Sequence, residues 1–285
     1  GLAALLLVWV AGNESFGAQL SLTIGGISIQ PSEFVKISFV FFVASMFYQS
    51  LEFKNICITT VVAALHVVIL VLSKDLGSAL IFFISYVIML FIATGNWLYL
   101  IAAGVLGKGA TSIAYTLFDH VRRRFTAWKN PWADIDNTGY QITQSLFAIG
   151  SGSWFGMGLL KGNPTAIPYV EADFIFSSIC EELGVIFGIC LILICVSSFL
   201  EMMRVAVCIH DRFYQLIVYG IGIMYIFQIF LTIGGGTKFI PLTGVTLPFI
   251  SYGGSSVMTT MIMFFIIQGI YIRLQKEGER RGGRK

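Results

Sequence analysis

Charged residues are scarce in this sequence, and their scarcity excludes an ordinary soluble fold. Only 12% of the 285 residues are Asp, Glu, Lys or Arg, whereas a soluble domain carries about 25%. The mean hydropathy of +0.84 agrees with this shortage of charge. The composition therefore predicts an integral membrane protein.

Histidine is almost absent and the cysteines follow no ligand pattern, so the sequence predicts no metal centre built from His or Cys. The three histidines lie far apart. The five cysteines have neither CxxC spacing nor the loop placement of a disulfide framework, and we expect them to be small packing residues. Long basic runs are also missing, since the longest is Arg122-Arg123-Arg124, and nothing indicates nucleic-acid binding.

Apolar runs of helix length dominate what the sequence does contain. A bilayer core admits only helices and closed barrels, and these runs show no strict alternation, so we predict an all-α polytopic membrane protein. We place eight spans near residues 1–12, 33–50, 56–73, 77–94, 97–117, 176–200, 214–233 and 256–272. No internal repeat is visible, which disfavours a transporter built from duplicated halves.

The chain opens on Gly1 inside an apolar run. This run, GLAALLLVWVAG, is shorter than the roughly 20 residues of a full span and lacks the basic start of a signal peptide. We expect it to be the remainder of a helix from a longer protein.

Basic residues near the helix ends predict the orientation of a single membrane domain, residues 1–285. The tail at 273–285 carries six basic residues and two acids, so we expect it to be cytoplasmic. The connections at 51–55 and 201–213 then fall inside. The segments predicted outside are 13–32, 118–175 and 234–255.

The large extracytoplasmic loop at 118–175 is the predicted location of the functional site. Loops beyond about 15 residues are usually functional or disordered, and this one is rich in Trp and Tyr. Its middle, SLFAIGSGSWFGMGLL, is apolar and glycine-rich but too broken to span. That pattern favours backbone lying at the membrane surface or dipping in against protein.

Asp173 stands where this loop meets the next span, just before Phe174, Ile175 and Phe176. An acid at a half-desolvated boundary has a raised pKa, which suits a general base. The alternative is a helix N-terminal acid favoured by the macrodipole. The spacing alone does not separate the two.

Glu181 and Glu182 lie two turns further into the predicted span. Carboxylates inside a membrane are costly and are usually paired or functional. They could be functional, or they could form a structural pair with a cation such as Lys36 or Lys108.

Three further polar residues lie at predicted outer helix ends. Glu33 and Lys36 share one helix face at i, i+3 spacing, as a solvated surface pair or as a pair facing substrate. Asp75 is either a capping residue or part of an outer polar cluster with Glu33 and Asp173.

Candidate phosphate-binding groups are present in the same long loop. The glycine-rich stretch 150–162 with Lys161 could cradle a pyrophosphate through backbone N–H groups, and so could His120, Arg122 and Arg124. Glycines also permit close packing, and arginines also snorkel.

Taken in order, seven stretches resemble the SEDS glycosyltransferases, the shape, elongation, division and sporulation family typified by RodA and FtsW. They cover nearly the whole chain. The stretches are QPSEFVK (30–36), KDLGSAL (74–80), RRRFTAWKNP (122–131), GYQITQSLFAIGSG (139–152), GMGLLKG (156–162), DFIFSSICEELG (173–184) and PFISYGGSS (248–256).

The resemblance implies a ten-helix membrane fold with both termini in the cytoplasm. About eight of those helices would be present here, with the long outer loop before the sixth. It also implies polymerisation of lipid II outside the bacterial cytoplasmic membrane, beside a class B penicillin-binding protein. Elongation, division and sporulation members share these motifs.

The resemblance assigns the essential acid to Asp173, as the base that takes a proton from the acceptor's 4-hydroxyl. It marks Glu33, Lys36 and Asp75 as functional, with Lys36 paired to Glu33 or Asp75. The candidates to offset the charge of the leaving group are Arg122, Arg124 and Lys161. Ser251 is grouped with these substrate-binding or site-organising residues. No cofactor is certain, although a divalent cation is possible.

The sequence departs from the family pattern at two places. Leu20 and Ser21 stand where Arg-Trp is common. Ala172 stands where Thr is usual. Because of this second change, we expect Asp173 to be held by Glu171 or by backbone. Two other functions are the alternatives: a lipid II flippase, which would use the same acids, and a non-catalytic scaffold for a penicillin-binding protein. Clustering of charge at the outer face favours the enzyme.

Overall fold

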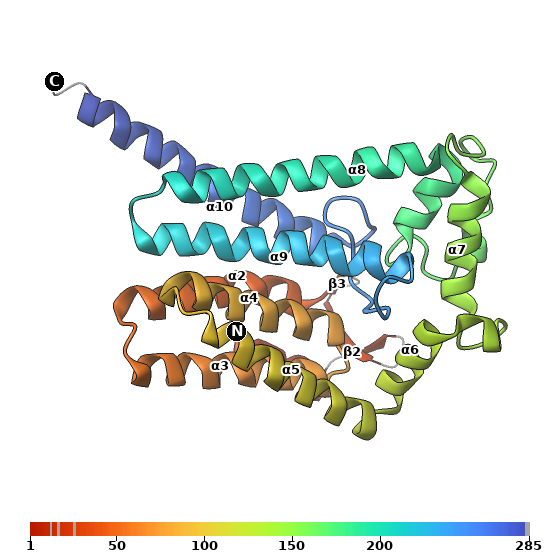
Figure 1. The fold of residues 1–285 in the computed structure, drawn as a ribbon, viewed down its shortest axis with the longest axis horizontal. Coiled ribbons are helices and arrows are strands. Elements are labelled where there is room, and N and C mark those ends of the chain that lie inside the picture. The colour runs from red at the N-terminus through yellow and green to blue at the C-terminus, as the bar shows by residue number, and fades with distance from the viewer. Residues whose placement is uncertain (12, 16–17, 25–26, 283–285) are drawn as a thin grey trace.

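The computed structural model of the chain is a bundle of long helices, crossed at one end by shorter ones (Figure 1). It describes residues 1–11, 13–15, 18–24 and 27–282. The fold confirms the predicted all-α multi-pass architecture.

Seven helices in the described ranges are long and apolar enough to cross a membrane. They are α2 (Pro31–Gln49), α3 (Phe53–Leu72), α4 (Leu76–Thr94), α5 (Leu98–Leu117), α8 (Ile175–Cys208), α9 (Arg212–Gly236) and α10 (Gly254–Gly282). Helix α1 (Leu2–Ala11) has 10 residues and corresponds to the short first span of the prediction. Helix α10 continues through most of the predicted tail, whose residues 283–285 lie outside the described residues.

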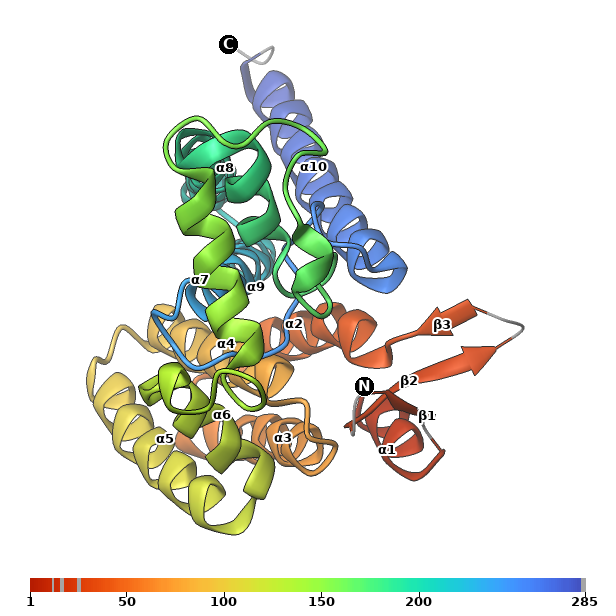
Figure 2. The ribbon, with the colours of Figure 1, turned by 90° about the vertical axis from the view of Figure 1, so that its right-hand side faces the viewer.

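A small antiparallel sheet occupies the connection between α1 and α2, which was predicted only as an outer segment. Its strands are β1 (Asn13–Ser15), β2 (Ala18–Ile24) and β3 (Ile27–Ile29), in that order. It projects beside the start of α2 (Figure 2).

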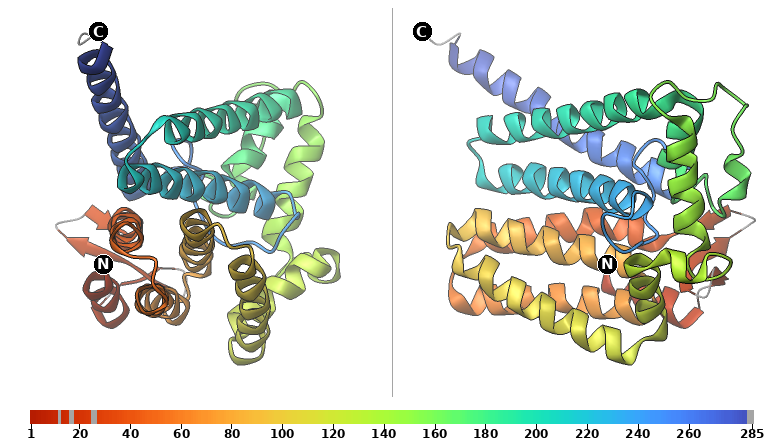
Figure 3. Two further views of the ribbon diagram at one scale, coloured as in Figure 1. Left: turned by 60° about the vertical axis from the view of Figure 1, so that its left-hand side comes forward. Right: turned by 45° about the vertical axis from the view of Figure 1, so that its right-hand side comes forward.

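Helix α9 is the centre of the bundle. It packs against α2, α4 and α8, and Figure 3 shows it between α8 and α4. Gly220 allows this close approach, because a β-carbon there would lie 2.7 Å from Val40 Cγ1 and 2.8 Å from Met89 Sδ. Helix α5 is the opposite case, since it has no buried residue.

The predicted long loop is folded and largely helical. It contains α6 (Asp119–Lys129), η1 (Pro131–Asp134), α7 (Tyr140–Gly152) and η2 (Pro164–Ala166). Helix α7 has 13 residues and crosses the ends of the long helices (Figure 2). We call this the loop end of the bundle, where α2, α4 and α10 begin and α3, α5 and α9 end.

Helix α8 is broken at Gly184, which the prediction of a continuous span over 176–200 missed. Gly184 has φ 88° and ψ 163°. The part of α8 before the break packs beside α7, and the part after it runs along the bundle (Figure 1).

The break exposes backbone groups that a helix would otherwise satisfy, and residues 153–158 bond to them. Met157 N donates to Glu181 O at 2.9 Å, and Gly158 N donates to Glu182 O at 3.0 Å. Across the break, Val185 N donates to Ser153 O at 2.9 Å. Irregular backbone at membrane depth requires this kind of protein partner.

Replacing the glycine at the break tests this arrangement. We expect Gly184→Ala to lower the free energy of unfolding by about 1–3 kcal/mol, because φ is positive there. The added β-carbon would also lie 2.3 Å from Trp154 O. The measurement is thermal or denaturant unfolding in detergent.

Gly150→Ala is the matched control. Gly150 lies within α7 with nothing within 4 Å of its β-carbon position, so Ala should raise stability by about 0.5–1 kcal/mol. Equal changes in the free energy of unfolding for Gly184→Ala and Gly150→Ala would contradict the strain that we assign to an alanine at position 184.

Candidate active site at the loop end of the bundle

Asp173 lies directly before α8, in the loop that returns from η2. Its backbone N donates to Tyr169 O at 3.1 Å. The side chain is half-buried, and its carboxylate makes no hydrogen bond or ion pair with any residue that the structure describes. The N-cap of α8 is Phe174, with no side-chain capping bond, so Asp173 does not cap the helix.

The surroundings of Asp173 favour its protonated form. Burial raises the pKa of Asp173 to about 6, the Arg124 cation opposes this rise, and the Glu171 carboxylate adds to it. An acid with a pKa near 6 is largely ionised at neutral pH and can accept a proton. These properties fit the predicted general base.

Arg124 is the cation that accompanies Asp173. A β-carbon on Gly244 would lie 3.6 Å from Asp173 Oδ2 and 3.7 Å from Arg124 Nη2, so both side chains lie against this glycine. Arg124 Nη1 donates to Leu242 O at 3.2 Å. Burial lowers the pKa of Arg124, whereas the carboxylates of Asp173 and Asp75 raise it.

The other two predicted cations are placed differently. Arg122 is exposed and pairs with Asp119 on its own helix. Lys161 is exposed, and within the described ranges its side chain makes no ion pair with Asp173. Of the three cations, Arg124 alone is positioned beside the candidate base.

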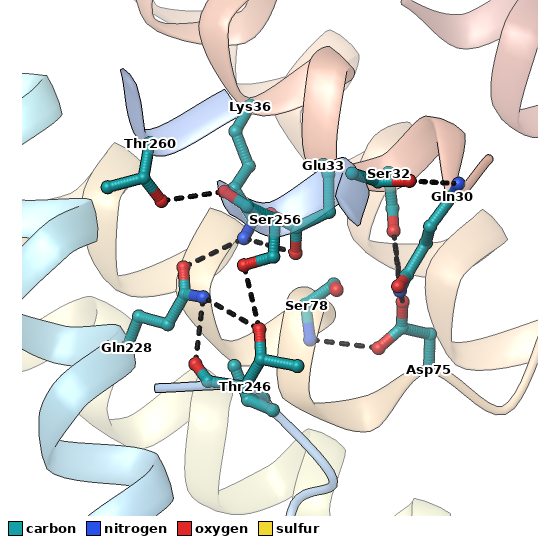
Figure 4. A network of polar contacts seen from close by, with 12 residues as sticks. Gln30, Ser32, Glu33, Lys36, Asp75, Ser78, Gln228, Thr246, Ser256 and Thr260 are labelled. Atoms are coloured by element: carbon teal, nitrogen blue, oxygen red, sulfur yellow. Dashed lines mark hydrogen bonds and ion pairs between the residues drawn. The ribbon is translucent and has the colours of Figure 1, made fainter. Parts of the chain in front are cut away.

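Asp75 caps α4, as one interpretation predicted, and its other partners are Ser32 and Gln30 rather than Glu33 and Asp173 (Figure 4). Its Oδ1 accepts from Ser78 N at 3.0 Å. Its Oδ2 accepts from Ser32 Oγ at 3.3 Å and from Gln30 Nε2 at 3.5 Å. These bonds tie the start of α2 to the start of α4.

Glu33 and Lys36 form a buried ion pair, so the interpretation as a solvated surface pair is wrong. Lys36 Nζ lies 2.7 Å from Glu33 Oε1, with side-chain exposures of 0% and 5%. Lys36 also donates to Gln228 Oε1 on α9 at 2.9 Å. The predicted choice between Glu33 and Asp75 is therefore resolved in favour of Glu33 (Figure 4).

Ser251 organises the backbone behind Asp173. Its Oγ accepts from Leu247 N at 2.8 Å and donates to Ala172 O. The next residue, Tyr252, donates its N–H to Glu171 O at 2.7 Å. Ala172 is thus held through its carbonyl.

Glu181 does not pair with Lys36 as one prediction proposed, because Lys36 bonds to Glu33 and Gln228. Glu181 Oε1 accepts from Asn163 N at 3.1 Å, and Oε2 is buried with no hydrogen-bond partner among the described residues. The other proposed cation, Lys108, is exposed on α5.

Two glycines within 150–162, Gly152 and Gly156, serve close packing. A β-carbon on Gly152 would lie 2.0 Å from Cys180 O, and one on Gly156 would lie 2.2 Å from Glu182 O. The packing interpretation of this stretch is therefore favoured over a phosphate cradle.

Sequence reasoning missed Gln228 and Thr246, which extend the network from Lys36. Gln228 Nε2 donates to Thr246 O at 3.0 Å, and Thr246 Oγ1 donates to Ser256 Oγ at 2.8 Å (Figure 4). The available signal was a single Gln inside the apolar run YIFQIFL. Polar residues within membrane segments are rare and usually functional.

No three His, Cys, Asp or Glu side chains in the described part of the chain group together as metal ligands. The site consists of one half-buried acid, one cation and a buried polar network.

Comparison with known proteins gives consistent similarities. The family model described as cell cycle protein, FTSW_RODA_SPOVE, matches residues 1–276. The chain is 32% identical over 285 residues to peptidoglycan glycosyltransferase RodA of Mycobacterium bovis, covering 94% of this chain and 61% of that protein. It is 35% identical to the probable peptidoglycan glycosyltransferase FtsW of Aliivibrio salmonicida, with coverages of 97% and 70%. Stage V sporulation protein E of Bacillus subtilis is 34% identical, with coverages of 92% and 73%.

Solved structures show the same fold at lower identity. A chain from a peptidoglycan synthase complex that coordinates polymerization and crosslinking matches with TM-score 0.82 and 23% identity, covering 96% of this chain and 79% of that one. Thermus thermophilus RodA matches with TM-score 0.66 and 23% identity, covering 95% and 74%. The present chain spans about three fifths of the length of the RodA relative from M. bovis.

The buried ion pair generates a stability prediction. Lys36→Met should lower the free energy of unfolding by about 3–5 kcal/mol, because it leaves the Glu33 carboxylate buried and unpaired. Adding Glu33→Gln should restore much of the loss, because the unpaired charge is then gone. Denaturant unfolding in detergent measures both variants.

Arg204→Met is the control, because Arg204 and Glu201 form an exposed pair at the same i, i+3 spacing, 3.7 Å apart. It should change stability little. Additive losses in the Lys36→Met/Glu33→Gln variant would argue against a coupled buried pair.

Proposed function

Because the chain belongs to the FtsW/RodA/SpoVE family of cell cycle proteins, we propose that it is a peptidoglycan glycosyltransferase. It polymerises lipid II into glycan strands at the outer face of the bacterial cytoplasmic membrane, with Asp173 as general base. The observation that carries the proposal is the state of Asp173: it is half-buried, its carboxylate has no hydrogen bond or ion pair with a described residue, and its pKa is raised.

The proposed reaction is a single displacement. Asp173 takes the proton from the 4-hydroxyl of the acceptor sugar while that oxygen attacks the anomeric carbon of the donor. The bond from this carbon to the pyrophosphate breaks, and undecaprenyl pyrophosphate leaves with the electron pair. One base on the attacking side suffices for inversion, so no second carboxylate is required as a nucleophile.

We propose that Arg124 stabilises the negative charge that develops on the leaving group. It lies beside the same glycine as Asp173 and its guanidinium is fixed by Leu242 O. A preorganised cation of this kind stabilises charge that develops in the transition state. Arg122 and Lys161 are exposed and would contact substrate only at the edge of the site.

If the reaction uses a divalent cation, we propose that this cation enters the site bound to the pyrophosphate of the substrate. Glu33, Asp75 and Glu181 each accept from a donor of the protein itself.

The proposed orientation places the loop end outside and the C-terminus in the cytoplasm. The support is the position of Lys54, Arg204 and Arg212, which lie with the start of the tail at the opposite end of the bundle. Positively charged segments favour the cytoplasmic side. The proposed partner is a class B penicillin-binding protein, in line with the similarity to a chain from a peptidoglycan synthase complex.

Asp173→Asn tests the base. We expect glycan polymer formation from lipid II to fall by about 10²–10⁴-fold, because the amide cannot accept the proton. The measurement is the initial rate of polymer formation by purified protein with its partner.

Asp136→Asn is the control, since Asp136 is an exposed acid in the same loop, and its rate should be unchanged. Undiminished polymerisation by Asp173→Asn would refute the base. Transport of lipid II without polymer would support a flippase, and polymer that depends only on the partner's own residues would support a scaffold.

The pH dependence tests the pairing of Asp173 with Arg124. A base must be ionised to act, so kcat/KM should rise with pH through about 6 and level off above it. The Arg124 cation lowers the pKa of Asp173, so Arg124→Met should move the midpoint to higher pH.

Arg123→Met is the matched control on the same helix, because Arg123 is exposed. The pH midpoint of kcat/KM for Arg123→Met should equal that of the unmodified protein. A midpoint that Arg124→Met leaves unmoved, or moves to lower pH, would show that the two groups do not interact as proposed.

A further inference from the structure

We infer that Gln228 is a positioning residue that couples the buried Glu33–Lys36 pair to the segment against which Asp173 and Arg124 lie. This segment is residues 241–247, which we call the strap. The kinetic part of the inference depends on the proposed function, whereas the structural part does not.

The strap has no regular secondary structure, so side chains must satisfy its backbone. Two residues of α9 do this on one side: Thr232 Oγ1 donates to Val245 O at 2.8 Å, and Gln228 Nε2 donates to Thr246 O at 3.0 Å. Arg124 Nη1 donates to Leu242 O at 3.2 Å on the other side. The strap therefore joins the centre of the bundle to the candidate site.

Packing leaves the strap little room to move toward α4. A β-carbon on Gly77 would lie 2.1 Å from Val245 Cγ2 and 2.9 Å from Thr243 O. Gly244, between these two strap residues, has φ +72° and lies against Asp173 and Arg124. A shift of the strap would consequently change the surroundings of both groups.

The ion pair determines which way the Gln228 amide faces. A lysine ammonium only donates, so the contact of 2.9 Å from Lys36 Nζ must be to the carbonyl oxygen, Oε1. The amide nitrogen then faces Thr246 O. A flipped amide would place two donors together at Lys36 and two acceptors together at Thr246.

The strap itself brings no charged residue to Asp173. The charged groups acting on Asp173 are Arg124 on α6 and Glu171 on its own loop, while Asp75 on α4 acts on Arg124. Because Arg124 is anchored on the strap at Leu242, loosening the strap releases this cation. The effect on Asp173 should then resemble loss of Arg124.

Two substitutions of Gln228 distinguish its contact with Lys36 from its contact with the strap. Gln228→Glu keeps an acceptor for Lys36 but removes the donor to Thr246 O. Gln228→Met removes both the acceptor for Lys36 and the donor to Thr246 O without adding a charge. It replaces Gln228→Glu in the test if that variant fails to fold. The matched control is Gln215→Met on the same helix, where the amide also donates to backbone carbonyls, Ala206 O and Ile209 O, at the opposite end of the bundle.

Hydrogen exchange of the strap is the first measurement and needs no enzymatic activity. We expect amide exchange in residues 241–253 to become about tenfold faster in the Gln228 variants, as for one lost hydrogen bond. Gln215→Met should leave it unchanged. Unchanged exchange in both Gln228 variants would overturn the inference.

The pH midpoint of kcat/KM is the second measurement, because a smaller folded fraction lowers the rate without moving the midpoint. We expect the Gln228 variants to move it to higher pH, as Arg124→Met does. Faster exchange with an unmoved or lowered midpoint would overturn the coupling to the site. If the unmodified protein forms no glycan polymer, the proposed function fails, and the exchange comparison still decides whether Gln228 holds the strap.

Discussion

Backbone polar groups that leave regular structure must find partners inside an apolar protein, and this constraint governs the loop end of the bundle. The break in α8 is satisfied by backbone of residues 153–158, and the strap is satisfied by side chains of α6 and α9. An unpaired buried group would cost roughly as much as a lost hydrogen bond or more. The positions of Gly156, Gly184 and Gln228 follow from this requirement.

The acids of the loop end differ in whether their oxygens are already used. Glu33 accepts from Lys36, Asp75 accepts from Ser32, Gln30 and Ser78, and Glu181 accepts from Asn163. These carboxylates hold the structure together. Asp173 is the contrasting case, because it is only half-buried and its carboxylate has no hydrogen bond or ion pair with the described residues. An acid whose oxygens accept no hydrogen bond from the protein is free to exchange a proton with a substrate.

Local patterns in the sequence predicted what depends on local physics. Seven long helices follow from apolar runs, and Asp173 attracted attention as an acid at an apolar boundary. The break at Gly184 could not be predicted in this way, because its partners are residues 153–158, about thirty positions earlier. The burial of Lys36 was hidden for the same reason, since its second partner, Gln228, is 192 residues away. Long-range partners decide which polar residues are buried.

The break in α8 also affects the position of the segment that carries Asp173. If α8 were straight, residues 173–183 would extend the long axis of the span beyond the end of the bundle. With the break, this part lies beside α7, and Ser145 Oγ on α7 contacts Ser177 Oγ at 2.5 Å and Gly236 O at 2.7 Å. Phe174, the neighbour of Asp173, packs with Ala148 of α7, and Asp173 and Arg124 both lie against Gly244 of the strap. The burial that raises the pKa of Asp173 therefore arises where the start of α8 meets the strap and α6.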